Sequence, residues 1–206
     1  MIKGYYFITD LRLSKKGNES DVQNAVETGV SIVQYRNKVS PFSAFCEEAK
    51  LLKKICKDKA LFIVNDRIDA AIFIDADGVH LGQEDMPYEE ARKRLGDKKI
   101  IGVTVHNTEE ALYYEKKGAN YLGVSPIFST TTKKGAGESG GIELVKEVRK
   151  ISKLPIVAIG GIDLSNAREV IQAGADSICA ISAVVAKDDV AEEIKRFQAL
   201  FKKSLT

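Results

Sequence analysis

The chain has 206 residues, of which 44% are hydrophobic and 29% are charged, with 16 glycines and 4 prolines. This composition is typical of an ordinary globular protein and excludes the disordered, collagen-like and disulfide-scaffold classes. The 31 basic and 29 acidic side chains give a formal net charge of +2. That balance does not predict nucleic acid or an anionic membrane surface as a partner.

The three cysteines, Cys46, Cys56 and Cys179, form no CxxC pair and are odd in number, so we expect reduced thiols in a cytosol. The first residues hold a short apolar run that ends at Asp10, which is unlike a secretory signal. No apolar stretch approaches the roughly 20 residues of a membrane span. We therefore expect a soluble, cytoplasmic protein.

Short apolar or β-branched runs recur along the chain, and longer stretches with helical spacing lie between them. This alternation predicts a parallel sheet built from strand–helix units. The predicted strands cover residues 5–9, 31–36, 61–64, 78–81, 100–105, 121–124, 156–159 and 177–181. The clearest predicted helices cover residues 42–57, 108–118 and 165–174, and a last helix runs from about 188 to 203.

A related glycine-containing turn leads into every even-numbered strand, in ETGVSIV, DADGVHL, KKGANYL and QAGADSI. A repeat over two strand–helix units favours a closed, pseudo-symmetric barrel over an open sheet. The alternative is a doubly wound open sheet, but its GxGxxG fingerprint is missing after the first strand. We predict a single-domain (β/α)8 TIM barrel over residues 1–206, in units of about 26 residues.

The active site of such a barrel lies at the C-terminal ends of its strands, and here these ends are polar. Strand alternation puts Gln34, Arg36 and Lys38 on one side, where an amide and two cations could converge on a ligand. The alternative for this stretch is a solvated basic loop.

Two carboxylates, Asp66 and Asp85, follow neighbouring strands. They favour Mg²⁺ over zinc, because the chain has only two histidines and no Cys/His cluster. Alternatively, Asp66 caps the helix that follows it. His80 is expected to point into the barrel as a satisfied core histidine, and His106 to lie at the end of its strand beside Thr104.

The long segment 125–141 combines hydroxyls, paired lysines and glycines, which suits an anionic ligand. After the last two strands, Gly160-Gly161 and Ser182 stand where many such barrels bind a phosphate. One anion site is thus cationic and the other mostly neutral. The pair predicts a transferase that joins two phosphorylated substrates.

Seven motifs occur in order along the chain: QYRNK (34–38), VNDR (64–67), DGVHLGQED (77–85), GVTVH (102–106), SPIFSTTTKK (125–134), IVAIGGI (156–162) and ISA (181–183). With them, the sequence resembles the thiamine-phosphate synthase family over essentially its whole length. The resemblance implies that 4-amino-2-methyl-5-hydroxymethylpyrimidine diphosphate and 4-methyl-5-(2-phosphooxyethyl)thiazole are joined to give thiamine phosphate and diphosphate. Loss of diphosphate would be dissociative and assisted by Mg²⁺.

The resemblance also implies a role for individual residues. The pyrimidine diphosphate would be held by Gln34, Arg36, Lys38, Asn65, Thr104 and Lys133. The thiazole phosphate would be held by Thr130, Thr131, Thr132, Gly161, Ile181 and Ser182. Asp66 and Asp85 would bind Mg²⁺, and Lys133, Arg36 and Thr104 would be catalytic.

Thr104 stands where the family usually has serine, and Ser125 where it usually has glycine. One alternative is a thiazole tautomerase, a paralogue on the same fold that does not need a diphosphate and metal site. Another is a non-catalytic barrel that binds thiamine phosphate. The expected partners are two phosphorylated small molecules, with no nucleic acid or membrane; a homo-oligomer is compatible with the sequence.

Overall fold

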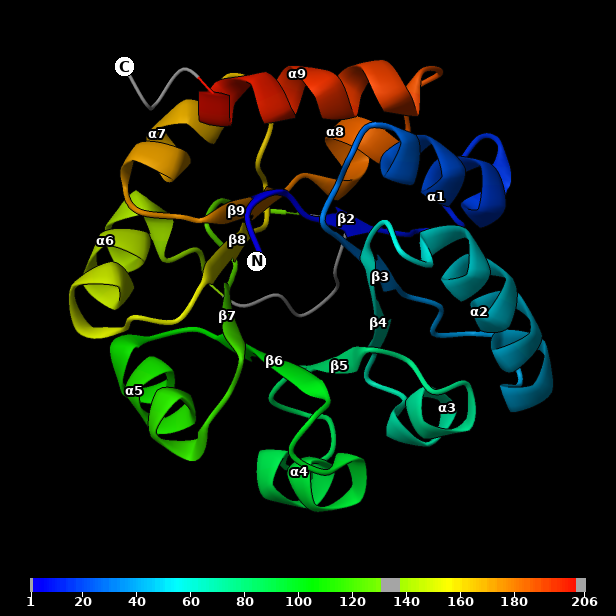
Figure 1. Cartoon of the computed structure of the whole chain (residues 1–206). Helices are drawn as coiled ribbons and strands as arrows, with labels where there is room; N and C mark the ends of the chain where they lie inside the picture. The colour runs from blue at the N-terminus through cyan, green and yellow to red at the C-terminus, as the bar shows by residue number, and fades with distance from the viewer. Residues whose placement is uncertain (1, 131–137, 203–206) are drawn as a thin grey trace.

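The computed structural model describes residues 2–130 and 138–202 as strands and helices that alternate along the chain (Figure 1). The strands are β1 (Gly4–Tyr5), β2 (Phe7–Ile8), β3 (Ile32–Tyr35), β4 (Leu61–Asn65), β5 (Gly78–Leu81), β6 (Ile100–Val105), β7 (Tyr121–Val124), β8 (Ile156–Ile159) and β9 (Ser177–Cys179). The helices are α1 (Gly17–Glu27), α2 (Phe42–Cys56), α3 (Ile68–Phe73), α4 (Tyr88–Leu95), α5 (Thr108–Lys117), α6 (Gly141–Ile151), α7 (Ala167–Gln172), α8 (Ile181–Val185) and α9 (Val190–Lys202).

The strands form one parallel sheet in the order β1-β9-β8-β7-β6-β5-β4-β3-β2. The two ends of this order, β1 and β2, are separated in sequence only by Tyr6, so the first segment of the chain closes the sheet into a barrel. The predicted (β/α)8 barrel is confirmed. The predicted first strand is split in two, because β1 pairs with β9 whereas β2 pairs with β3 on the other side.

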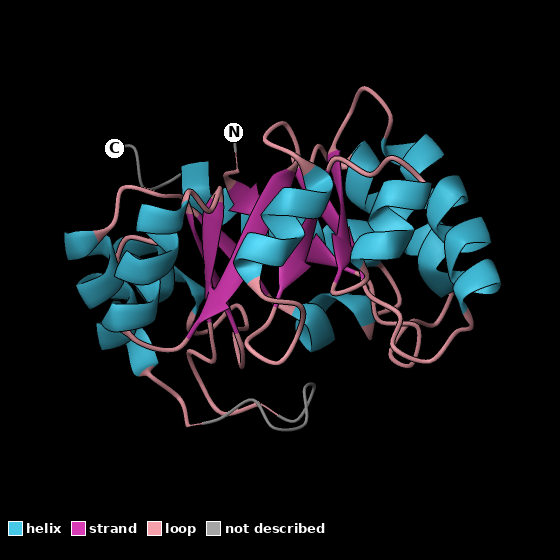
Figure 2. Ribbon diagram, turned by 90° about the horizontal axis from the view of Figure 1, so that it is seen from below, coloured by secondary structure: helices cyan, strands magenta, loops and turns pink. Residues whose placement is uncertain are grey.

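The helices surround the barrel because each buries one apolar face against it (Figures 1 and 2). In α2, the buried side chains recur at helical spacing. In α5, the Oδ1 atom of Asn107 accepts a hydrogen bond from the Glu110 backbone N–H at 2.8 Å and so caps the first turn. No helix within the described residues is long and apolar enough to cross a membrane.

A second, smaller core fills the inside of the barrel. We call it the inner core; its buried members are Ile2, Tyr6, Ile8, Ile32, Ile63, Tyr121, Val157 and Cys179. Ile8 and Cys179 also line the cavity described below, so the inner core forms part of the cavity wall. Side chains from the strand ends are therefore held above a packed interior, as is usual in such barrels.

Candidate active site

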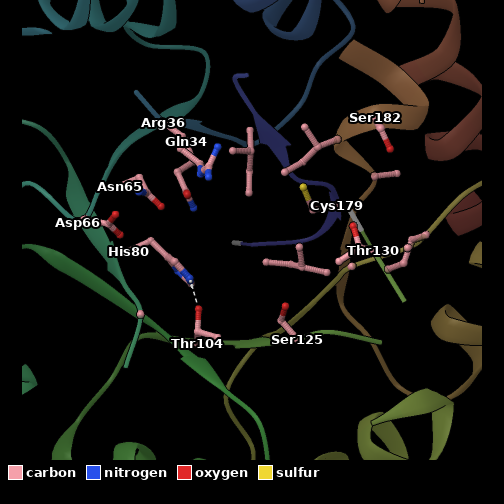
Figure 3. Close-up of a pocket in the computed structure, with 18 of the residues that line it drawn as sticks. Gln34, Arg36, Asn65, Asp66, His80, Thr104, Ser125, Thr130, Cys179 and Ser182 are labelled. Carbon is pink, nitrogen blue, oxygen red and sulfur yellow. Dashed lines mark hydrogen bonds between the residues drawn. The ribbon is translucent and has the colours of Figure 1, made fainter. Parts of the chain in front are cut away.

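One cavity collects the predicted site residues at the C-terminal ends of the strands (Figure 3). Every predicted site residue that the structure describes lines it: Gln34, Arg36, Lys38, Asn65, Asp66, Asp85, Thr104, Thr130, Gly161, Ile181 and Ser182. Thr131, Thr132 and Lys133 lie outside the described residues. These residues are far apart in sequence but lie close together, because all parallel strands of the barrel end at the same rim.

One wall of the cavity is charged, and we call it the charged wall; its residues are Arg36, Lys38, Asp66 and Asp85, from the segments after β3, β4 and β5. The ammonium of Lys38 lies 2.5 Å from Oδ2 of Asp66. Strand alternation had predicted that Gln34, Arg36 and Lys38 share a side, and Tyr35 indeed packs away from them, against Phe45.

Asp10 supports the charged wall and was not identified from the sequence. Its carboxylate is 1% exposed and accepts hydrogen bonds from the guanidinium groups of Arg12 at 3.0 Å and Arg36 at 3.2 Å. A buried carboxylate with two guanidinium partners holds an arginine in one orientation. The available signal was its position just after the first strand, the same criterion that selected the other site residues.

The carboxyl groups of Asp66 and Asp85 face each other closely enough to interact. Burial raises the pKa of Asp85 above its usual range, and a hydrogen bond to Asp66 raises it further. Oδ2 of Asp85 is also held by the Gly82 backbone N–H at 2.7 Å. The position of Asp66 in the cavity wall, against Lys38, argues against a purely capping role, and it makes no side-chain cap to α3.

This carboxylate pair suits a hard divalent cation. Within the described residues, no group of three or more His, Cys, Asp or Glu side chains could hold a metal. A metal here would therefore take only two protein carboxylates and complete its shell with water or phosphate oxygens, which is the usual arrangement for Mg²⁺. The donor set fits Mg²⁺ and does not fit a structural zinc site.

The opposite wall offers backbone groups and hydroxyls, and we call it the neutral wall; its residues are Thr130, Gly160, Gly161, Ile181 and Ser182. In Figure 3, Thr130 and Ser182 lie across the cavity from Asn65 and Asp66. Gly161 has a φ of +62°, and a Cβ atom there would lie 2.6 Å from the Ser129 carbonyl oxygen. Only glycine allows this close approach of two backbone segments.

The two histidines differ in position. His80 is buried and lines the cavity, and both of its ring nitrogens are hydrogen-bonded, as expected for a satisfied interior histidine. His106 is exposed and lies outside the cavity lining, and its Nδ1 atom contacts the backbone carbonyl of Ser125. Ser125 itself lines the cavity.

Comparisons with known proteins show the family of the chain. The family model described as thiamine monophosphate synthase matches residues 5–184. The chain is 54% identical to the thiamine-phosphate synthase of Methanosarcina mazei, over 94% of this chain and 80% of that protein. The Methanosarcina barkeri enzyme is 55% identical, over 94% and 88% respectively. The solved thiamine phosphate pyrophosphorylase from Pyrococcus furiosus is 40% identical with a TM-score of 0.89, covering 98% of this chain and 97% of that one.

Proposed function

Because the chain belongs to the thiamine monophosphate synthase family and is a transferase, we propose that it makes thiamine phosphate in this cavity. Its substrates are the hydroxymethylpyrimidine diphosphate and the thiazole phosphate, and its second product is diphosphate. Residues 1–206 act as one catalytic domain in the cytoplasm. Small phosphorylated molecules, and neither nucleic acid nor a membrane, are its partners.

One observation carries this proposal: a single cavity has a charged wall and a neutral wall, and these suit two different phosphorylated groups. A diphosphate that leaves carries more negative charge than a phosphate monoester, so it needs cations. In agreement with this, and following the family resemblance, we assign the pyrimidine diphosphate to Gln34, Arg36, Lys38, Asn65, Thr104 and Lys133. We assign the thiazole phosphate to Thr130, Thr131, Thr132, Gly161, Ile181 and Ser182.

The proposed reaction needs no nucleophilic side chain. The bond between the methylene carbon and the diphosphate oxygen breaks, and both electrons leave with the diphosphate. The lone pair of the thiazole nitrogen then forms the new carbon–nitrogen bond to that methylene. The chain contributes by holding both reactants in one cavity and by placing cations where negative charge develops.

Arg36 and Lys38 stabilise the departing diphosphate, and Asp10 keeps the Arg36 guanidinium in place. Lys133 is assigned the same role from the sequence. Asp66 and Asp85 would hold Mg²⁺, which would neutralise further diphosphate charge when bound. Thr104 lines the cavity between the charged wall and Ser125, and we assign its hydroxyl to the pyrimidine.

The direct test is to incubate the protein with both substrates and Mg²⁺ and to measure thiamine phosphate by mass spectrometry and diphosphate by an enzymatic assay. We expect the two products in equal amounts, and none when either substrate is omitted. Binding of both substrates without product would instead favour the non-catalytic barrel. Isomerisation of the thiazole phosphate alone would favour the tautomerase, for which the position of His106 outside the cavity lining offers no support.

A further inference from the structure

Below the cavity, five buried side chains form one continuous chain of hydrogen bonds across the inside of the barrel. Nε2 of Gln34 donates to the Tyr6 hydroxyl at 2.9 Å, and the hydroxyls of Tyr6 and Tyr121 are 2.8 Å apart. The Tyr121 hydroxyl lies 2.9 Å from Nδ1 of His80, and Nε2 of His80 lies 2.9 Å from Oγ1 of Thr104. We call these five residues the buried chain.

Only part of the buried chain can touch a ligand. Gln34, His80 and Thr104 line the cavity, whereas Tyr6 and Tyr121 lie behind it, fully buried in the inner core. Gln34 and Thr104 come from β3 and β6, so the two tyrosines and the histidine connect cavity groups that belong to separated strands. Figure 3 shows the His80–Thr104 hydrogen bond at the cavity edge.

Two strand glycines make room for the buried chain. Gly102 is the register partner of both His80 and Tyr121, and a Cβ atom on it would lie 1.9 Å from Cζ of Tyr121. Gly123 is the register partner of Thr104, and a Cβ atom there would lie 2.8 Å from Cε1 of His80. Any larger residue at these positions would displace the rings, so the interior is packed around this set of hydrogen bonds.

All hydrogen bonds of the buried chain are donated in the same direction, away from Gln34. A tyrosine hydroxyl has a single hydrogen. Because the Tyr6 hydroxyl accepts a hydrogen bond from Gln34, its own hydrogen has one acceptor within the buried chain, the hydroxyl oxygen of Tyr121. In the opposite sense, the Tyr6 O–H would be buried without an acceptor, which is costly. Tyr121 then donates to Nδ1 of His80, and the imidazole proton resides on Nε2 and is donated to Thr104.

This direction decides what the two ends offer to a ligand. At one end, the Gln34 amide has its nitrogen toward Tyr6, which leaves Oε1 as an acceptor on the side of the cavity that holds Arg36 and Lys38. At the other end, Oγ1 of Thr104 already accepts from His80, which leaves its hydroxyl hydrogen to donate. The neighbouring cations Arg36 and Lys38 also favour an amide oxygen over an amide N–H on that side.

We propose that Tyr6, Tyr121 and His80 are positioning residues that fix this polarity and thereby select an aminopyrimidine over a pyrimidine in which donor and acceptor are exchanged. The proposal rests on the proposed function. An aminopyrimidine offers N–H donors beside an unprotonated ring nitrogen, which complements an acceptor at Gln34 and a donor at Thr104. The corresponding 4-oxopyrimidine offers a carbonyl oxygen beside a ring N–H, which is the inverse pattern.

The test measures binding, by calorimetry with Mg²⁺ present and no thiazole phosphate. The ligands are the aminopyrimidine diphosphate, its 4-oxo analogue and inorganic diphosphate. We expect the wild-type protein to prefer the amino over the oxo compound by about 100-fold, since two mismatched hydrogen bonds cost roughly tenfold each. Tyr121→Phe keeps the ring over Gly102 and removes only the hydroxyl, so the amino compound should bind about tenfold more weakly and the preference should fall to about tenfold or less.

Two further variants guard against an indirect effect. Tyr6→Phe breaks the buried chain next to Gln34 and should lower the preference in the same way, so it decides the question if Tyr121→Phe does not fold. Tyr88→Phe is the matched control, because Tyr88 is a buried tyrosine on α4 whose hydroxyl contacts Arg92, outside the barrel interior. Its preference should equal that of the wild type.

Inorganic diphosphate separates positioning from general damage, because it probes the charged wall alone. Its affinity should change by less than about twofold in Tyr121→Phe and Tyr6→Phe. An unchanged preference for the amino compound in the folded variants, or an equal loss of diphosphate affinity, would overturn the proposal. If the wild-type protein turns over both substrates but the variants keep the full preference for the amino compound, only this inference is refuted. If the wild-type protein does not bind the aminopyrimidine diphosphate, the proposed function is refuted as well.

Discussion

The charged wall and the neutral wall differ in the groups that they offer to an anion. The charged wall carries ionisable side chains at short range. The Lys38 ammonium lies 2.5 Å from the Asp66 carboxylate, and the Asp85 carboxyl group accepts a hydrogen bond from the Gly82 backbone N–H. Around Gly161 and Ser182, backbone groups and a hydroxyl replace side-chain charge. The difference suggests that charge is concentrated where a leaving group develops negative charge, and that neutral donors suffice where a phosphate is only held.

Removal of the divalent metal should separate the walls most completely. With a chelator, we expect turnover to be abolished and then restored by Mg²⁺, because the two carboxylates would otherwise repel the diphosphate. The affinity for the thiazole phosphate, measured by calorimetry, should change by less than about threefold, since the neutral wall contains no metal ligand. Full turnover in chelator would contradict the metal assignment.

Loss of one cation on the charged wall should have the next largest effect. Lys38→Ala should lower kcat/KM by about 100-fold, equivalent to about 3 kcal/mol of transition-state stabilisation, and we expect the same for Lys133→Ala. Because Lys38 is half exposed, the free energy of unfolding should change by only about 0.5 kcal/mol. Steady-state kinetics and thermal melting check both values.

Lys150→Ala is the control for that experiment, since Lys150 is an exposed lysine on α6. It should leave kcat/KM unchanged. If Lys38→Ala also left kcat/KM unchanged, the alternative interpretation of the QYRNK segment as a solvated basic loop would be favoured.

Gly161→Ala tests the neutral wall. We expect KM for the thiazole phosphate to rise about tenfold with a smaller effect on kcat, because the new Cβ would push against Ser129 and Phe128 and shift the backbone that lines the cavity. Gly29→Ala is the matched control: Gly29 also has a positive φ, +80°, but nothing lies within 4 Å of its added Cβ. Gly29→Ala should lose roughly 1 kcal/mol of stability because of its positive φ, and Gly161→Ala should lose more because of the added clash. Only Gly161→Ala should change KM.

The smallest expected effect concerns the stability of the metal-free protein. Asp85→Asn should increase the free energy of unfolding at neutral pH by roughly 0.5 kcal/mol, since an amide keeps the contact with Gly82 and removes a carboxylate whose ionised form is disfavoured by burial and by Asp66. Because the pKa of Asp85 is raised on folding, its stabilising contribution is complete below the pKa of the unfolded chain and is lost as the pH rises through the folded-state pKa.

The measurement is denaturant unfolding of the wild type and of Asp85→Asn without metal, from acid pH to neutral pH. The difference between the two proteins should grow as the pH rises and should disappear at acid pH. A variant that is less stable than the wild type at neutral pH would show that the two carboxyl groups do not oppose each other.

Residues selected by their position at a strand end line one cavity in the structure, whereas contacts across the barrel interior were not predicted from the sequence. Gln34 lies near the end of a strand, and Asp66 and Ser182 follow one. Parallel strands all end at one rim, so local sequence is sufficient to bring these residues together. Asp10 followed the same rule, but its role depends on Arg36, which is 26 residues away. Tyr6 and Tyr121 looked like ordinary strand residues, since nothing near them in sequence reveals their contact.

The order of hydrophobic and polar residues by itself determined the barrel, the rim at which the cavity lies and the side of β3 that faces this cavity. These depend on periodicity and chain order, which are local properties. Only the tertiary structure decided that the first strand divides between β9 and β3, that Asp10 holds Arg36, and that Tyr6 meets Tyr121. Those contacts depend on strand register and on which side chains reach across the interior, and both arise only when the barrel closes.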